Sequence, residues 1–477
     1  MNKKSKKKGY KLLRILAKII AGVLILILLL ILFIRSPWGQ NIIVDKITSS
    51  FAEKTNTKIE IDRLFFTFYG NINLDGLYLE DQQGDTLIYS KNLEADIPIW
   101  PVIRGRGISV NSLDWIGVRA NIHREDSLKG FNFDYLLEAL TASDTTTSQD
   151  TTQAAPMQIE IGEVHLSNFN LRYDDKVSGI DSEIDVGRLT LEMDKTDLEN
   201  MDFQIADLEI KHSRIKYHQT KAFPESDEEE VPLPKLSANS VRLENIEAMY
   251  NSVPDSLEVQ ADIGRFLTLN PNLDLPQNRI GIDQIDLGSS QIAVNIQINP
   301  DIDDTSLQNQ EGFTWPEYYL SLKELNLENN SFTFTENGRE PQENNFDPTA
   351  IALENLNGRA TDFLFEEQKA LLTLETLTFN EYSGLDLKEF SGDFKVTDVS
   401  MNFSDLQFQL NQNNLQGDFS AEYTSINDFI QNPESSMVSL NLSEFRINID
   451  DLFRFQPELR ENEYLLALGK KLVNGQV

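Results

Sequence analysis

The chain of 477 residues contains no cysteine and only four histidines. Without cysteine it forms no disulfide and offers no thiolate nucleophile or thiolate metal ligand. The histidines are His123, His165, His212 and His218, and all fall on or beside polar positions of expected strands. His212 and His218 lie six residues apart, a spacing that suits metal ligation poorly, so we expect no metal site and no cofactor.

The sequence also lacks the short motifs that carry most enzyme chemistry. It has no HExxH, GxSxG or Walker A segment, and no glycine-rich phosphate cradle precedes an expected helix. The acidic run 227–230 lies between two prolines, as solvated loops often do, and residues 301–304 lack the glycine and distal glutamate of a calcium loop. We therefore expect that the protein is not an enzyme.

Positive charge is scarce beyond the N-terminus. The first 35 residues carry nine lysines and arginines and no acid, which leaves 33 basic against 76 acidic residues in the remaining 442. Nucleic-acid binding needs clustered Lys and Arg to neutralise phosphates, so this composition argues against it. A soluble, self-repelling acidic surface is the simpler interpretation.

A long apolar run covers residues 17–34, where Lys18 is the only charge. With Leu12 and Leu13 it reaches the roughly 20 residues that span a hydrocarbon core. The basic flank in front of it predicts a cytoplasmic N-terminus, so everything after Arg35 lies on the other side. A cleaved signal peptide is the alternative, but it would need a shorter run and a small-x-small site, whereas this run ends in FIRSP. We expect an uncleaved single-pass anchor.

The remaining chain is too long for one compact core and divides by its patterns. Residues 36–143 begin with a short amphipathic helix at 38–54, continue as short alternating strands from Ile59, and include a helix at 131–140. Residues 144–156 (DTTTSQDTTQAAP) form a low-complexity loop. Residues 157–455 form a β-repeat region, and 456–477 hold a helix (457–472) and the start of one more strand.

An internal repeat dominates the chain, with apolar residues at offsets i, i+2, i+7 and i+9. The sets are Leu113, Trp115, Ala120, Ile122; Val164, Leu166, Leu171, Tyr173; Leu208, Ile210, Ile215, Tyr217; Val241, Leu243, Ala248, Tyr250; Ile285, Leu287, Ile292, Val294; and Leu325, Leu327, Phe332, Phe334. Their starts lie 51, 44, 33, 44 and 40 residues apart, while position i+5 is mixed. The change from even to odd offsets predicts a bulge or tight turn that flips the pleat. Such a period indicates an array of supersecondary units.

Each unit presents one apolar and one polar face, and the apolar face must be covered. It could pack on a second sheet as a sandwich core, or it could line a trough that meets a ligand. Tyrosines at i+9 would lie at a rim, with the ring buried and the hydroxyl in water. The clearest candidates for a lipid-groove lining are Leu171, Tyr173, Ile215, Tyr217, Ile292, Val294, Phe332 and Phe334.

The order of these features resembles the AsmA-like superfamily. The resemblance begins with the basic tail, the anchor and the short helix, followed by residues 57–64 (TKIEIDRL) and 70–81 (GNINLDGLYLED). Residues 164–181, 379–385 (FNEYSGL) and 415–419 (LQGDF) are similar to the TamB branch, the inner-membrane subunit of a translocation and assembly module. The likeness covers the N-terminal portion of such proteins, and its motifs are structural rather than catalytic.

This resemblance implies a mainly β fold, in which the transmembrane helix is followed by an elongated, repetitive antiparallel β groove (a β-taco) with a few short helices. It implies a body in the periplasm of a Gram-negative cell, anchored in the inner membrane. There the groove would shelter phospholipid acyl chains on their way to the outer membrane. The alternative is an assembly factor or scaffold that aids outer-membrane protein biogenesis through strand-edge contacts, with an outer-membrane barrel assembly protein as partner.

The chain departs from that branch in length, since its relatives are usually much longer and end in a dedicated β-domain. Residues 473–477 (VNGQV) look like the first residues of another strand. Either the product is truncated or a partner completes the array, and in the first case the last strand edge would be prone to pairing.

Overall fold

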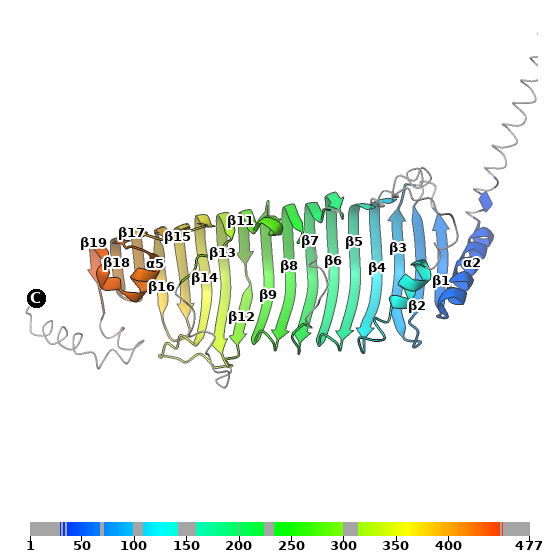
Figure 1. Cartoon of the computed structure of the whole chain (residues 1–477), viewed down its shortest axis with the longest axis horizontal. Coiled ribbons are helices and arrows are strands. Elements are labelled where there is room, and N and C mark those ends of the chain that lie inside the picture. Colours follow the sequence, from blue (N-terminus) through cyan, green and yellow to red (C-terminus); the bar gives the residue numbers. More distant parts are fainter. Residues whose placement is uncertain are drawn as a thin grey trace, which may run out of the picture. The chain divides into compact units, whose positions relative to one another are not determined.

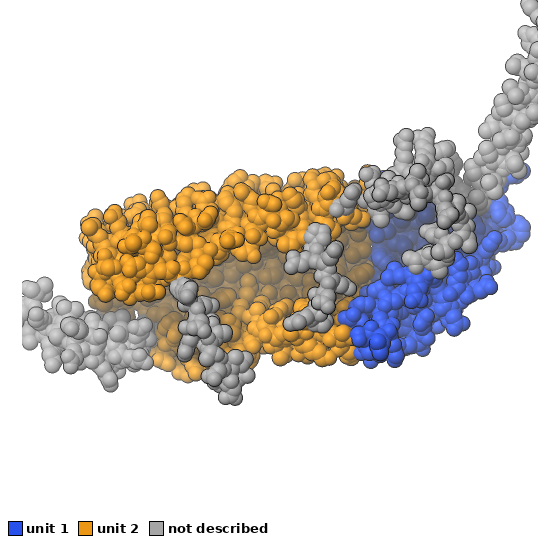
Figure 2. All heavy atoms as spheres, viewed as in Figure 1, with its two compact units in different colours: residues 1–158 blue, residues 159–477 orange. Residues whose placement is uncertain are grey.

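The computed structural model describes residues 36–66, 71–98, 108–141, 159–198, 200–223, 233–298 and 313–448, with residues 29, 32, 33 and 451. The chain forms two compact units, residues 1–158 and 159–477 (Figure 2). Most of the predicted anchor, the loop at 144–156, both acidic runs and the helix at 457–472 lie outside the described residues. Within the described part of the chain, no helix is both long and apolar enough to cross a membrane.

Unit 1 begins with helix α2 (Pro37–Thr55), which confirms that a helix lies at the expected residues 38–54. Ser36 caps it, since the Ser36 hydroxyl accepts a hydrogen bond from the Gly39 amide at 3.0 Å, and Pro37 occupies the first turn. Asn56 ends the helix in the left-handed conformation, with a φ of 55°.

Four antiparallel strands follow in unit 1, each paired with the next. They are β1 (Ile59–Phe66), β2 (Ile72–Glu80), β3 (Thr86–Asp96) and β4 (Ile108–Arg124). The second helix, α4 (Asp134–Thr141), falls within the expected segment 131–140 apart from its last residue, Thr141. Leu79, Leu87 and Tyr135 form the core of this unit, and Phe51 of α2 packs against them.

Unit 2 is almost entirely β, and its fifteen described strands belong to one sheet (Figure 1). The strands are β5 (Ile159–Asp175), β6 (Ile180–Asp197), β7 (Asp202–Gln219), β8 (Lys235–Ser252), β9 (Leu257–Leu269), β10 (Asn272–Asp274), β11 (Arg279–Gly288), β12 (Gln291–Ile296), β13 (Tyr319–Glu336), β14 (Ala350–Glu366), β15 (Lys369–Glu381), β16 (Asp386–Thr397), β17 (Ser400–Leu410), β18 (Asn413–Glu422) and β19 (Met437–Arg446). The short helices are η2 (Leu275–Gln277), α5 (Ile426–Gln431) and η3 (Pro433–Ser435).

The sheet of unit 2 is mixed, so the expectation of a purely antiparallel groove is wrong. Strand β8 runs parallel to β7, and β13 runs parallel to both β11 and β12. Strands β8 and β13 therefore start at the same end of the sheet as β7 and β12, the strands that precede them in the chain. Repeat copies spaced by 33 and 40 residues therefore lie directly beside each other. Copies spaced by 44 residues have an antiparallel strand between them.

A small apolar cluster packs at the C-terminal part of unit 2. Tyr423 and Ile426 are buried there, and Trp315 from the segment before β13 packs against them. The Trp315 indole nitrogen donates to Asp398 Oδ1 at 3.2 Å, and the Tyr423 hydroxyl donates to the Thr397 carbonyl at 2.9 Å. This cluster holds α5 against the sheet.

Candidate functional site: an apolar trough

The eight predicted lining residues fall into two continuous cross-strand rows on one face of unit 2. Row A consists of Leu171, Ile184, Ile215, Ala248, Ala261, Ile292, Phe332 and Leu353, each the register partner of the next. Row B consists of Tyr173, Ser182, Tyr217, Tyr250, Val259, Val294, Phe334 and Ile351. Register partners in a sheet point to the same face, so the structure brings all eight residues together.

Two further rows continue the apolar face toward the other strand ends. Row C consists of Leu166, Leu189, Ile210, Leu243, Phe266, Leu287 and Leu327. Row D consists of Val164, Leu191, Leu208, Val241, Thr268, Ile285, Leu325 and Ala360. Ten of these residues belong to the predicted repeat sets, although the prediction did not include them in the lining; Leu189, Leu191, Phe266, Thr268 and Ala360 were not part of those sets.

A line of backbone irregularities crosses the sheet between rows C and A, and we call it the bulge line. Its members are Asn168, Gly187, His212, Asn245, Gly264, Ser289 and Asn329, which follow one another across neighbouring strands. The five that are not glycine have φ values of 50° to 53°. A left-handed residue inside a strand bends it and flips the pleat, so the predicted break between i+2 and i+7 is confirmed and lies at i+4.

The glycines of the bulge line permit close strand contact. A Cβ atom on Gly187 would lie 2.4 Å from the His212 carbonyl oxygen, and one on Gly264 would lie 2.4 Å from that of Ser289. Only glycine allows the backbones to approach so closely.

The pattern of exposure shows which side of the bend carries the apolar rows. In β8, Arg242 and Glu244 are exposed before the bulge, and Asn245, Glu247 and Met249 are exposed after it. In four of the five bulged copies of unit 2, position i+5 is buried; these residues are Ser213, Ile246, Ser290 and Asn330. Because the inner side of a bend is crowded and the outer side is open, the apolar rows lie on the concave side. Figure 2 shows unit 2 hollowed along its length between two raised rims.

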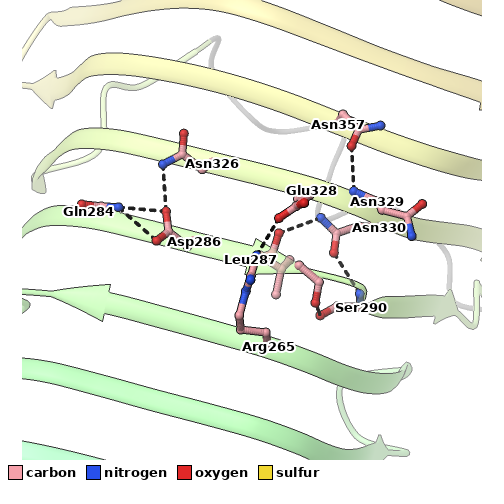
Figure 3. Close-up of polar contacts among 11 residues, drawn as sticks. Arg265, Gln284, Asp286, Leu287, Ser290, Asn326, Glu328, Asn329, Asn330 and Asn357 are labelled. Carbon is pink, nitrogen blue, oxygen red and sulfur yellow. Dashed lines mark hydrogen bonds and ion pairs between the residues drawn. The ribbon is translucent and has the colours of Figure 1, made fainter.

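The polar residues at i+5 satisfy backbone groups that the bulges leave unpaired. The Asn330 side chain accepts from the Ser290 amide at 2.9 Å and donates to the Leu287 carbonyl at 2.9 Å (Figure 3). Ser290 Oγ accepts from the Gly264 amide at 3.2 Å, and Ser213 Oγ accepts from the Gly187 amide at 3.2 Å. This role explains why position i+5 is mixed in the sequence, since its polar members serve the backbone.

The convex face is polar and held by ion pairs between strands. Arg265 pairs with Glu328 at 2.6 Å (Figure 3), and Lys216 pairs with Glu183 at 3.2 Å. A hydrogen bond from Arg214 lowers the pKa of Glu247, and the positive charge of Arg214 adds to the effect. With its charged side chains, the convex face is suited to contact with solvent.

Tyrosines mark one rim of the trough, as the i+9 pattern predicts. The Tyr217 hydroxyl donates to Gln219 Oε1 at 3.0 Å, and the Tyr250 hydroxyl donates to Asp255 Oδ2 at 2.8 Å. Burial raises the pKa of Tyr217, and the neighbouring Tyr250 and Asp255 act in the same direction. The rings belong to row B, while their hydroxyls join the polar turns at the strand ends.

The apolar rows are only partly covered. None of the eight predicted residues is buried, and Ile215 keeps 38% of its surface exposed. The described strands of unit 2 form one sheet rather than two facing sheets. A sandwich core would bury these side chains almost completely, so an open trough describes unit 2 better than the sandwich alternative.

Phenylalanines extend the apolar face toward the C-terminal strands, which sequence reasoning missed. Phe394, Phe403, Phe419 and Leu440 are successive register partners that start from Leu372 of β15. Leu372 shares a face with Leu374, the partner of Ala360 in row D. The centroids of Phe394 and Phe403 lie 5.2 Å apart, and those of Phe403 and Phe419 lie 5.5 Å apart. The spacing of these residues departs from the repeat offsets i, i+2, i+7 and i+9, so the repeat search did not find them. The alternation of apolar and polar residues in β16–β18 was a signal that could have found them.

The side chains of rows A to D offer mainly van der Waals contact. Among the described residues, no group of three or more His, Asp or Glu side chains could hold a metal ion. His212 lies on the bulge line, where its Nδ1 is 3.4 Å from Asn245 Nδ2, and His165 lies 3.5 Å from Glu163.

No protein-family model matches the chain, and no curated protein is similar enough to count as a match.

Proposed function

We propose that the protein is a lipid-transfer protein of the AsmA-like, TamB-like kind, anchored in the inner membrane with its body in the periplasm. Its trough would shelter phospholipid acyl chains on their way to the outer membrane. The observation that carries this proposal is the set of four apolar rows, which run on the concave side of one sheet while their side chains stay partly exposed.

The energetics of acyl chains suit such a lining. Each CH₂ group moved out of water contributes about 0.8 kcal/mol, so a continuous apolar lane holds a chain without specific polar contacts. Rows A to D provide this lane, and the rim hydroxyls of Tyr217 and Tyr250 form its boundary with water.

Photo-crosslinking in membranes tests the proposal. A benzophenone residue at Ile215, Tyr217 or Phe332 should form phospholipid adducts that mass spectrometry identifies. Lys216 and Thr333 alternate with row positions and face the convex side. A benzophenone residue at either position should form no phospholipid adduct. If row positions yield only protein adducts, the trough is a partner-binding surface and transport is wrong.

One observation favours the scaffold alternative. Within the described residues, β19 pairs only with β18, and its Met437, Leu440 and Phe445 side chains are exposed by 72%, 59% and 59%. An exposed apolar strand of this kind can accept a further strand. Protein crosslinks confined to β19, with no lipid in the trough, would support an assembly factor acting with an outer-membrane barrel protein.

A further inference from the structure

A cavity of about 480 Å³ lies in unit 1, on the face of α2 that meets α4. This volume falls within the range of small-ligand sites, roughly 300–1,000 Å³. Ile43, Ile47, Phe51 and Ala139 supply apolar walls, and Lys46 and Lys54 also line it. The cavity therefore combines an apolar interior with positive charge.

The lining follows the geometry of the helix. Ile43, Ile47 and Phe51 are spaced by four residues and form one stripe along α2. Lys46, Ser50 and Lys54 have the same spacing and form the adjacent stripe. At 1.5 Å per residue the two lysines are roughly 12 Å apart along the axis. An apolar stripe beside a cationic stripe fits a molecule with an acyl chain and an anionic head.

The charge around Lys46 supports an anionic occupant. Several lysines of the described chain are paired with acids, for example Lys195 with Asp202 at 2.6 Å and Lys235 with Asp274 at 3.0 Å. Within the described chain the Lys46 ammonium has no such partner, although acids outnumber bases by 76 to 42. An ammonium group that lies beside an apolar cavity and has no acidic partner is available to bind a phosphate.

We propose that this cavity binds an anionic phospholipid of the membrane surface, with an acyl chain along the Ile43–Phe51 stripe and the phosphate at Lys46 and Lys54. The inference rests on the proposed function, and it adds a lipid class that the trough alone does not select. Helix α2 begins three residues after the apolar run 17–34, so an anchor in that run keeps the cavity close to the bilayer surface.

The test uses the full chain reconstituted in phosphatidylcholine vesicles that contain a trace of phospholipid with a diazirine in one acyl chain. One set carries photoreactive phosphatidylglycerol and the other carries photoreactive phosphatidylcholine. After irradiation, mass spectrometry compares adducts on peptides from α2 and α4 with adducts on peptides from β7 and β13. Phosphatidylglycerol should label α2 and α4 on the order of tenfold more strongly than phosphatidylcholine.

Two variants and a matched control make the test specific. The double variant Lys46→Gln/Lys54→Gln should remove the preference for phosphatidylglycerol, while Ile47→Glu should reduce labelling by both lipids, because it puts charge into the apolar stripe. The control, Lys91→Gln/Lys129→Gln, removes the same charge from unit 1 outside the cavity and should leave labelling unchanged. All four lysines are exposed, so the fold should tolerate these changes.

The outcomes separate this inference from the proposed function. Labelling of β7 and β13 without α2 and α4 overturns the cavity and leaves the trough standing. The reverse pattern supports the cavity and overturns the trough. Equal labelling of α2 and α4 by both lipids, or a preference that survives the double variant, also overturns the anionic site.

Discussion

Tyr217 of β7 and Tyr250 of β8 stack face to face across the parallel strand pair. Their ring centroids are 5.2 Å apart and their planes are inclined by 3°. The two residues are register partners, because each occupies position i+9 of its repeat copy. Copies that lie 33 residues apart in the chain are thus direct neighbours, and equivalent side chains form continuous rows across the sheet.

Placing a charge in row A should empty the trough without unfolding it. Ile215→Glu and Phe332→Glu leave a carboxylate that an acyl chain cannot solvate, so lipid crosslinking at Tyr217 should fall strongly. Because Ile215 is already 38% exposed, the thermal midpoint should change little. Lys216→Glu on the convex side is the matched control and should leave lipid crosslinking intact. Unfolding of Ile215→Glu would mean that the row is a sealed core.

Removing the Asn330 side chain should destabilise unit 2. Asn330→Ala leaves the Ser290 amide and the Leu287 carbonyl without partners, at about 1–3 kcal/mol for each buried group. Denaturant unfolding followed by circular dichroism measures the loss. Asn326→Ala is the control, because its partners Asp286 and Glu324 are carboxylates that water can reach. Equal losses in the two variants would contradict a special role for the bulge line.

A methyl group at Gly264 should strain the bulge line. Its Cβ would lie 2.4 Å from the Ser289 carbonyl oxygen, which requires a backbone shift that costs about 1–3 kcal/mol. At Gly281 the nearest atom to an added Cβ is Ser321 Oγ at 3.2 Å, the end of a small side chain. Gly264→Ala should therefore lower the midpoint of unfolding clearly more than Gly281→Ala. The opposite order would show that the strands can separate freely at the bulge.

Acid should weaken the turn between β8 and β9. The hydroxyls of Ser252 and Tyr250 donate to the Asp255 carboxylate at 2.7 and 2.8 Å, which holds its pKa below the usual value. A carboxyl with a lowered pKa stabilises the fold above its unfolded pKa of about 3.9, and this contribution is lost as the pH falls through the folded value.

The test compares the thermal midpoints of wild type and Asp255→Asn across that range. Their difference should be largest at neutral pH and should disappear in acid. The control is Asp262→Asn, because the Asp262 carboxylate is exposed and makes no side-chain hydrogen bond in the described chain. This variant should leave the thermal midpoint nearly unchanged at pH 7. A difference that grows in acid would give the opposite sign and contradict the turn contacts.

Local patterns predicted the two helices of unit 1 and the strands that carry the six repeat copies. Ser36, Pro37 and Asn56 bound α2 as cap chemistry requires, and offsets of two and seven residues revealed the pleat and its flip. The asparagines at 168, 245 and 329, residues that tolerate the left-handed region, lie at i+4 and were a readable signal for the bulge.

Strand direction was not readable in the same way. The offsets 0, 2, 7 and 9 read the same in both directions, so β6 and β9 carry the pattern too, at residues 182–191 and 259–268. Ser182 and Thr268 interrupt it there, which is why a search for four apolar residues passes over these strands. A symmetric pattern cannot distinguish a parallel from an antiparallel neighbour.

The sequence by itself determined the mainly β character, the apolar face and eight of the sixteen residues of rows A and B, because alternation and spacing are local properties of the chain. Only the tertiary structure decided that β7 and β8 run parallel, that four rows line up across the strands, and that Asn330 and Ser290 serve the backbone at the bend. Those features depend on which strands meet and in which register. Pairing between distant segments sets both, and the pattern within one strand does not encode them.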